Sequence, residues 1–123
     1  MIGGNLCNAA PTADIVPPLI VLGALAKFIE IDGKRIVPVE DFFTGPGVTI
    51  MKHYQVLIEI RIPNLELHAA GAYVKQTRGR GADLAVVGVA ALVMDRETVQ
   101  EVKIALGAVL HPLQSGPKRP KEF

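Results

Sequence analysis

The most regular alternation of apolar and polar residues in the chain lies between residues 55 and 62. One parity holds Val56, Ile58, Ile60 and Ile62, and the other holds Gln55, Leu57, Glu59 and Arg61. Because successive side chains of a strand point to opposite faces, the pattern predicts a strand with one apolar face. Leu57 is then an apolar residue on an otherwise polar face. Either an apolar group covers it or it is a scattered surface leucine, and the pattern alone favours neither.

Other apolar stretches predict two groups of strands on either side of a linker at residues 63–70. The first group is a hairpin, because Ala26–Ile31 and Lys34–Val37 flank Asp32-Gly33, a preferred two-residue turn. In the second group a strand starts at residues 72–75 and leads to a basic, glycine-punctuated turn at 77–83. Ala82–Met94 is apolar on both faces and rich in valine, which favours a buried central strand. Val99–Leu110 predicts a second long strand.

Helical character is confined to short segments. Asp14–Leu25 predicts a helix that Asp14 opens as N-cap, with prolines at positions 17 and 18 in its first turn. Val39–Phe43 predicts a single helical turn, and Thr44–Gly47 predicts a loop. Together with the strands, these segments predict an α+β fold.

The first thirteen residues predict a loop, since they hold adjacent glycines, two asparagines and a proline. Gly3 and Gly4 lack a Cβ, so the main chain there can take positive φ and lie close to another molecule. Main-chain N–H groups that lead to a helix start are donors for an anion such as a phosphate. A Gly-Gly-Asn turn is more often structural than ligand-binding, and Asp14 can be a plain N-cap.

Composition narrows the function classes. Half of the 123 residues are hydrophobic, which predicts a folded chain, and the net charge of +1 gives no case for nucleic acid as a partner. The single cysteine and three scattered histidines show no metal-ligand spacing, and they fit a reduced, cytoplasmic protein. No apolar run is long enough to cross a membrane. No nucleophile–base pair or carboxylate dyad is visible, so we expect any activity to come from a cofactor.

Five segments together resemble the FAD-binding subunit of the molybdenum hydroxylases, the family of xanthine and carbon monoxide dehydrogenases. They are Ile2-Gly-Gly-Asn-Leu-Cys-Asn-Ala-Ala-Pro-Thr-Ala-Asp-Ile-Val-Pro-Pro-Leu19, Val39-Glu-Asp-Phe-Phe-Thr-Gly-Pro-Gly47, Leu57-Ile-Glu-Ile-Arg-Ile-Pro63, Tyr73-Val-Lys-Gln-Thr-Arg-Gly-Arg-Gly-Ala-Asp-Leu-Ala85 and Ile104-Ala-Leu-Gly-Ala-Val109. They occur in the family's order and at about its spacing. The resemblance implies that residues 1–63 are the second subdomain of a PCMH-type FAD-binding domain. It also implies that residues 64–123 are part of a flavoprotein C-terminal domain with a truncated antiparallel sheet.

The resemblance implies FAD as the cofactor and assigns roles to seven residues. Ile2, Gly3, Gly4 and Asn5 would offer donors to the dinucleotide, and Asp14 would accept from a ribityl or ribose hydroxyl. Leu57 would pack on the flavin, and Lys75 would place a cation near the ring system, although a lone strand lysine is usually solvated. The implied partners are a molybdopterin-binding large subunit and a 2Fe-2S small subunit. Electrons would pass from the iron–sulfur clusters through FAD to NAD or another acceptor.

The sequence departs from the family at both ends. It begins at the second half of the FAD site, with Met1 where Thr or Ser is usual, and it ends at Phe123, where the family continues into helices that cover the sheet. We therefore expect weak or no FAD binding by the isolated chain. Either a separately encoded N-terminal FAD half is a further partner, or the chain is a degenerate remnant or a fragment of a truncated gene. The alternative is a flavin-free interaction or scaffold remnant of that subunit.

Overall fold

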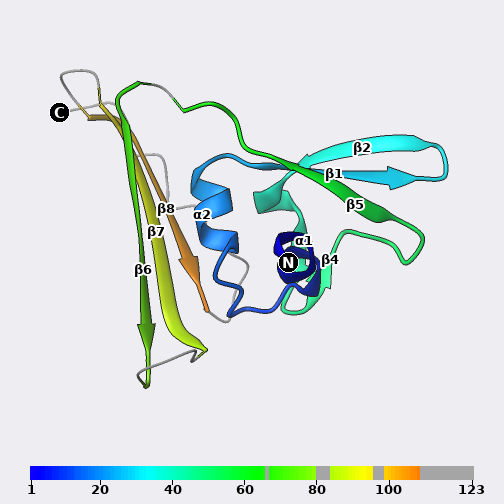
Figure 1. Ribbon diagram of the computed structural model, residues 1–123, viewed down its shortest axis with the longest axis horizontal. Coiled ribbons are helices and arrows are strands. Elements are labelled where there is room, and N and C mark those ends of the chain that lie inside the picture. The colour runs from blue at the N-terminus through cyan, green and yellow to red at the C-terminus, as the bar shows by residue number, and fades with distance from the viewer. Residues whose placement is uncertain (66, 80–83, 96–98, 109–123) are drawn as a thin grey trace.

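The computed structural model describes residues 1–65, 67–79, 84–95 and 99–108 (Figure 1). Within these residues two short helices and one 3₁₀ turn accompany strands that form three antiparallel sheets, in the orders β2-β1-β5, β3-β4 and β6-β7-β8. The predicted α+β class is therefore confirmed. Figure 1 shows the β6-β7-β8 sheet on one side of the molecule and the β2-β1-β5 sheet on the other, with helix α2 between them.

The first sheet is built on the predicted hairpin, which is confirmed. Strand β1 (Leu25–Glu30) pairs antiparallel with β2 (Gly33–Pro38), and Gly33 closes the turn with a φ of 141°. Only glycine adopts such a φ without a steric penalty. On the other side β1 pairs with β5 (Val56–Arg61), so the predicted strand at 55–62 is also confirmed.

The faces of β5 differ from the predicted ones because the strand contains a β-bulge. Lys27 pairs with Glu59 and Phe28 pairs with Leu57, so Ile58 has no partner on β1. An extra residue reverses the alternation of side chains beyond it. Leu57 therefore shares the core face with Ile60, and both pack against the buried cluster. The prediction that Leu57 lies on one face with Glu59 and Arg61 is wrong.

Three short elements between β2 and β5 complete the core on the first sheet. The 3₁₀ turn η1 (Val39–Asp41) confirms the predicted helical turn. The predicted loop at 44–47 is instead a small hairpin of β3 (Phe43–Gly45) and β4 (Val48–Thr49) around Gly47, whose φ is 70°. The core has two fully buried phenylalanines, Phe28 and Phe42, with ring centroids 6.5 Å apart.

The other three-stranded sheet, called the second sheet from here on, comprises β6 (Ala69–Thr77), β7 (Ala85–Asp95) and β8 (Val99–Gly107). Strand β7 is its central strand, as predicted. Strand β6 starts within the predicted linker. The prediction that the central strand is buried on both faces is wrong. Its inner face is buried through Ala90 and Leu92, whereas its outer-face residues Val89, Ala91 and Val93 are only half-buried. Apolar residues of the neighbouring strands on the same outer face are exposed: Val74 on β6, and Val102, Ile104 and Leu106 on β8. The chain beyond residue 108 lies outside the described residues, as do parts of the predicted basic turn.

Helix α2 (Val16–Val21) packs on the inner face of β7 and β8. It is shorter than the predicted segment 14–25 at both ends. Its N-cap is Ile15 and no side chain caps it, so the prediction of Asp14 as N-cap is wrong. Gly23 ends the helix with a φ of 66°, and the N–H of Ala24 bonds the carbonyl of Leu19 at 2.9 Å. This is the Schellman arrangement, in which a left-handed glycine stops a helix.

Candidate functional site

The predicted N-terminal loop is a short helix, α1 (Ile2–Asn8), and the loop prediction is wrong. Neither Gly3 nor Gly4 is among the described glycines with positive φ. Adjacent glycines disfavour a helix locally, but the fully buried Leu6 anchors this one to the core. The N–H of Asn5 donates to the carbonyl of Met1 at 3.2 Å, so the three preceding N–H groups have no acceptor within the helix.

The surroundings of the two glycines would accept a Cβ at ordinary van der Waals distances. A Cβ on Gly3 would lie 3.7 Å from Cδ2 of Leu57, and a Cβ on Gly4 would lie 3.4 Å from Cε of Met1. The structure thus brings two predicted site residues together, Gly3 from α1 and Leu57 from β5. Leu57 is half-buried, so part of its side chain stays accessible beside α1.

Asn5 provides the clearest test of whether a ligand fits here. Its Oδ1 is buried and has no hydrogen-bond partner among the described residues. A buried amide oxygen without a donor costs free energy, so such an atom calls for a further donor. The hydroxyl and amino groups of a dinucleotide are donors of the required kind. Asn5 and the glycine main chain therefore fit a group such as FAD.

A second cluster joins α2 to the second sheet. Lys75 Nζ on β6 donates to Asp14 Oδ2 at 2.7 Å, and Tyr73 Oη on the same strand donates to Asp14 Oδ1 at 3.4 Å. The Asp14 side chain is 43% exposed and the Lys75 side chain 29% exposed, so both remain reachable from solvent. Burial, followed by the Asp14 charge and hydrogen bond, raises the pKa of Tyr73. The phenol is therefore protonated at neutral pH and can donate.

Tyr73 was not among the predicted site residues. Its place two residues before Lys75 on a strand could have identified it, because residues at that spacing share a face. The prediction for Asp14 and Lys75 came from family resemblance, and the structure joins these two residues across 61 positions of sequence.

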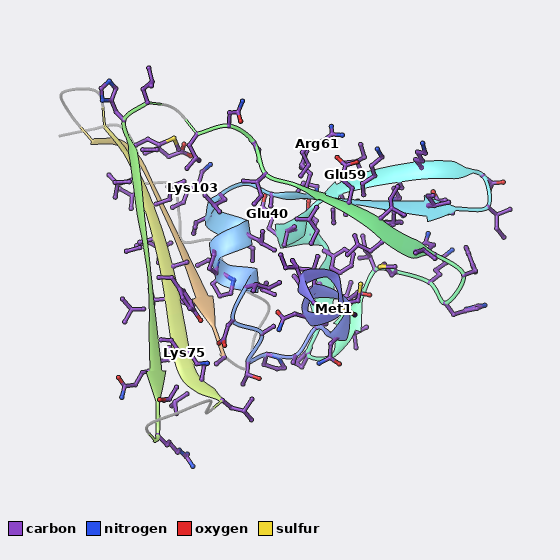
Figure 2. All side chains as sticks on the ribbon, viewed as in Figure 1. Met1, Glu40, Glu59, Arg61, Lys75 and Lys103 are labelled. Carbon is purple, nitrogen blue, oxygen red and sulfur yellow. The ribbon has the colours of Figure 1, made fainter. Side chains whose placement is uncertain are left out.

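The segment between α1 and α2 is bonded to the turn between β3 and β4 and to the residue that follows β8. The carbonyl of Ala9 accepts from the Gly47 N–H at 2.9 Å, and the carbonyl of Pro11 accepts from the Ala108 N–H at 2.7 Å. Figure 2 shows Met1 at the start of α1 and Lys75 on β6, with this segment running between them. Within the described residues no hydrogen bond or ion pair joins Gly3 or Leu57 to Asp14 or Lys75.

Metal or thiol chemistry has little support in the described part of the chain. There, no group of three or more His, Cys, Asp or Glu side chains is placed to hold a metal ion. Cys7 is exposed, and its Sγ lies 3.8 Å from Sδ of Met51. Partial burial raises the pKa of the Cys7 thiol, which keeps it in the less reactive protonated form. No helix among the described residues is long and apolar enough to span a membrane.

Comparison with known families identifies the first half of the chain. Residues 1–65 match the family described as the FAD binding domain in molybdopterin dehydrogenase. The match includes six of the seven predicted site residues and ends before Lys75.

Among curated proteins, the chain is 32% identical over 107 residues to a putative xanthine dehydrogenase FAD-binding subunit of Escherichia coli K12, covering 85% of this chain and 37% of that protein. It is 34% identical over 109 residues to the carbon monoxide dehydrogenase medium chain of Hydrogenophaga pseudoflava, with the same two coverages, 85% and 37%. The chain thus spans little more than a third of the length of these relatives.

Two solved structures have the same fold. Carbon monoxide dehydrogenase from Hydrogenophaga pseudoflava superposes with a TM-score of 0.86 at 28% identity, over 98% of this chain and 45% of that one. Quinoline 2-oxidoreductase from Pseudomonas putida 86 superposes with a TM-score of 0.81 at 30% identity, over 94% of this chain and 40% of that one.

Proposed function

Since the chain belongs to the family of FAD binding domains in molybdopterin dehydrogenases, we propose that it forms part of the FAD site of a multi-subunit molybdenum hydroxylase. The proposed role is electron transfer from iron–sulfur clusters to NAD or another acceptor. The proposed partners are a molybdopterin-binding large subunit and a 2Fe-2S small subunit. We place the protein in the cytoplasm, because its single cysteine cannot form an intrachain disulfide.

The observation that supports this proposal best is the pairing of predicted residues that are far apart in sequence. Asp14 meets Lys75 at 2.7 Å, and Gly3 lies beside Leu57. A chain that had kept only the fold would need neither an exposed carboxylate–ammonium pair nor a buried amide oxygen without a donor. The acceptor oxygens of Asn5 and Asp14 suit a ligand that carries hydroxyl groups, and the Lys75 ammonium suits negative charge on it.

Each predicted residue has a definite task in the proposed site. The dinucleotide is bound by the main chain of Ile2, Gly3 and Gly4 and by the side chain of Asn5. Asp14 accepts a hydrogen bond from one hydroxyl group of the dinucleotide. Leu57 provides apolar surface for the flavin ring, and Lys75 holds a positive charge nearby, where it favours negative charge on the ring system. FAD, when bound, supplies the redox chemistry, and these residues bind and orient it. We propose residues 1–63 and 64–123 as the two domain parts.

The second candidate is a flavin-free interaction or scaffold domain. The outer face of the β6-β7-β8 sheet favours it, because exposed apolar residues on one sheet face are typical of a surface that another polypeptide covers. Val74, Val102 and Ile104 are each more than a third exposed there. A scaffold needs this face but does not need the pairing of Asp14 with Lys75.

A titration of trace FAD with the purified chain distinguishes the two candidates. We expect weak or no quenching of flavin fluorescence by the isolated chain, and clear quenching when an N-terminal FAD half is added. Leu57→Ala should weaken the quenching, because Leu57 provides the apolar contact with the ring. Ile31→Ala, at an exposed hairpin position, is the matched control and should have no effect. No quenching by the chain, with or without the added half, would favour the scaffold.

A further inference from the structure

Two glycines face each other on the inner side of the second sheet. Gly88 of β7 pairs with Gly107 of β8. A Cβ on Gly88 would lie 2.7 Å from Oη of Tyr73, and a Cβ on Gly107 would lie 2.7 Å from Cγ of Pro17. Cβ atoms do not approach other atoms this closely, so a Cβ at either position would force the side chain of Tyr73 or Pro17 to shift. The pair forms a shallow depression in the sheet that receives one side chain from β6 and one from α2.

This depression determines where the Tyr73 hydroxyl lies. With its ring over Gly88, Tyr73 reaches Asp14 Oδ1 at 3.4 Å. Lys75, on the same face of β6, reaches Oδ2 of the same carboxylate at 2.7 Å. Pro17 lies three residues after Asp14 in the first turn of α2, and its contact with Gly107 fixes the position of that turn. The carboxylate is thus held at both oxygens, and the main chain that carries it is held as well.

We propose that Tyr73 is a positioning residue of the flavin site, which together with Lys75 holds the Asp14 carboxylate in one orientation over the Gly88–Gly107 depression. The inference rests on the proposed function and adds to it a residue outside the predicted set. Each carboxylate oxygen has about two acceptor positions, so one on each oxygen stays open for a ligand hydroxyl. Because the carboxylate is already ordered, accepting that hydroxyl costs little side-chain entropy.

The raised pKa of Tyr73 provides a readout that needs no flavin. The chain has two tyrosines, so Tyr54→Phe leaves Tyr73 as the only phenol whose ionisation changes the ultraviolet absorbance. In that background Asp14→Asn removes the carboxylate charge that helps to raise the pKa. We expect the Tyr73 titration to move to lower pH. An unchanged titration would overturn the contact between Tyr73 and Asp14.

FAD affinity tests the role of that contact. Tyr73→Phe keeps the ring and removes only the hydroxyl, and we expect about tenfold weaker FAD binding, the usual effect of losing one hydrogen bond to a charged group. Tyr54→Phe is the matched control and should bind FAD as the unsubstituted chain does. Gly88→Ala should also weaken binding, because its methyl group displaces the tyrosine. Gly45→Ala is its control, since a Cβ there meets no atom within 4 Å.

The outcomes separate this inference from the proposed function. Tyr73→Phe binding FAD as tightly as the unsubstituted chain would overturn the positioning role and leave the proposed function intact. Weaker binding by Tyr73→Phe, with circular dichroism and melting temperature unchanged, would support it. If the chain fails to bind FAD even with an N-terminal half present, the proposed function falls, and with it the role of Tyr73 at a flavin.

Discussion

The two three-stranded sheets build their inner faces from side chains of opposite size. In the β2-β1-β5 sheet the central residue is Phe28, which is fully buried against Phe42 and has the Arg35 guanidinium 5.8 Å from its ring centroid. In the β6-β7-β8 sheet the corresponding surface of β7 and β8 is small where α2 lies, with Ala90, Ala105 and a pair of glycines, and the larger Leu92 and Tyr73 lie beside them. The inner face of the first sheet fills the core with large side chains, whereas the small residues of the second sheet leave space for Pro17 of α2 and Tyr73 of β6.

The difference explains how each sheet holds its part of the candidate site. Large buried side chains keep β1 and β5 in place from within, and Leu57 rests on that core. The second sheet instead receives α2, an element from the first segment of the chain, at a distance that only small residues permit. Asp14 precedes that helix, so its position relative to Lys75 depends on how closely α2 approaches β7 and β8.

The largest expected effect comes from removing volume in the first sheet. Phe28→Ala should destabilise the chain by about 3–5 kcal/mol, because it deletes a buried ring and leaves a cavity between Phe42 and the strand. Urea unfolding followed by circular dichroism measures the change. Ile31→Ala removes an apolar residue that is 83% exposed, and should change stability little. Equal effects of the two substitutions would contradict the assignment of the core.

In the second sheet the damaging change is an addition of volume. Gly107→Ala should destabilise the chain by about 1–3 kcal/mol, the usual cost of overpacking, because its methyl group would lie 2.7 Å from Pro17. The same unfolding measurement checks it, with Gly45→Ala as the matched glycine control. If Gly107→Ala were neutral, α2 would not be packed closely on β8 and the contrast between the sheets would be lost.

Much of the fold follows from local sequence, and the exceptions share a cause. The hairpin at Asp32-Gly33 and the turn at Val39 were predictable because their residues determine backbone geometry by themselves. The bulge at Ile58 was not, because it depends on the register with β1. Helix α1 was not predictable either, since its stability comes from burying Leu6 and not from the propensity of Gly3 and Gly4.

The same distinction holds for the candidate site. Asp14, Leu57 and Lys75 were proposed from family resemblance, and the structure shows which of them meet. Tyr73 was missed because its part depends on space above Gly88, a residue on the neighbouring strand. The sequence does not show that the Tyr73 ring lies over Gly88. A glycine in a valine-rich strand is expected only to weaken that strand, unless the side chain packed on it is known.

The smallest expected effect concerns the outer face of the first sheet and depends on pH. Lys27 and Arg61 both approach the Glu59 carboxylate at 2.9 Å, and these hydrogen bonds, Lys27 first, lower the pKa of Glu59 from its ordinary value of 4.5. A depressed pKa in the folded state means that the ionised carboxylate stabilises the fold. That contribution is complete above the ordinary pKa and is lost as the pH falls through the folded value.

Glu59→Gln should therefore lower the urea midpoint slightly at neutral pH and not at all in acid, because the unsubstituted chain has lost the same ion pairs there. The effect should also shrink in high salt, since the carboxylate lies at the surface. Asp32→Asn is the control, because asparagine before Gly33 keeps a favourable turn and removes a carboxylate from the same sheet. A difference between Glu59→Gln and the unsubstituted chain that persists unchanged in acid would mean that Glu59 acts through packing. Packing would then stabilise the outer face of the first sheet as it stabilises the inner face. The contrast between large and small side chains would in that case hold for the two sheets as a whole and not only for their inner faces.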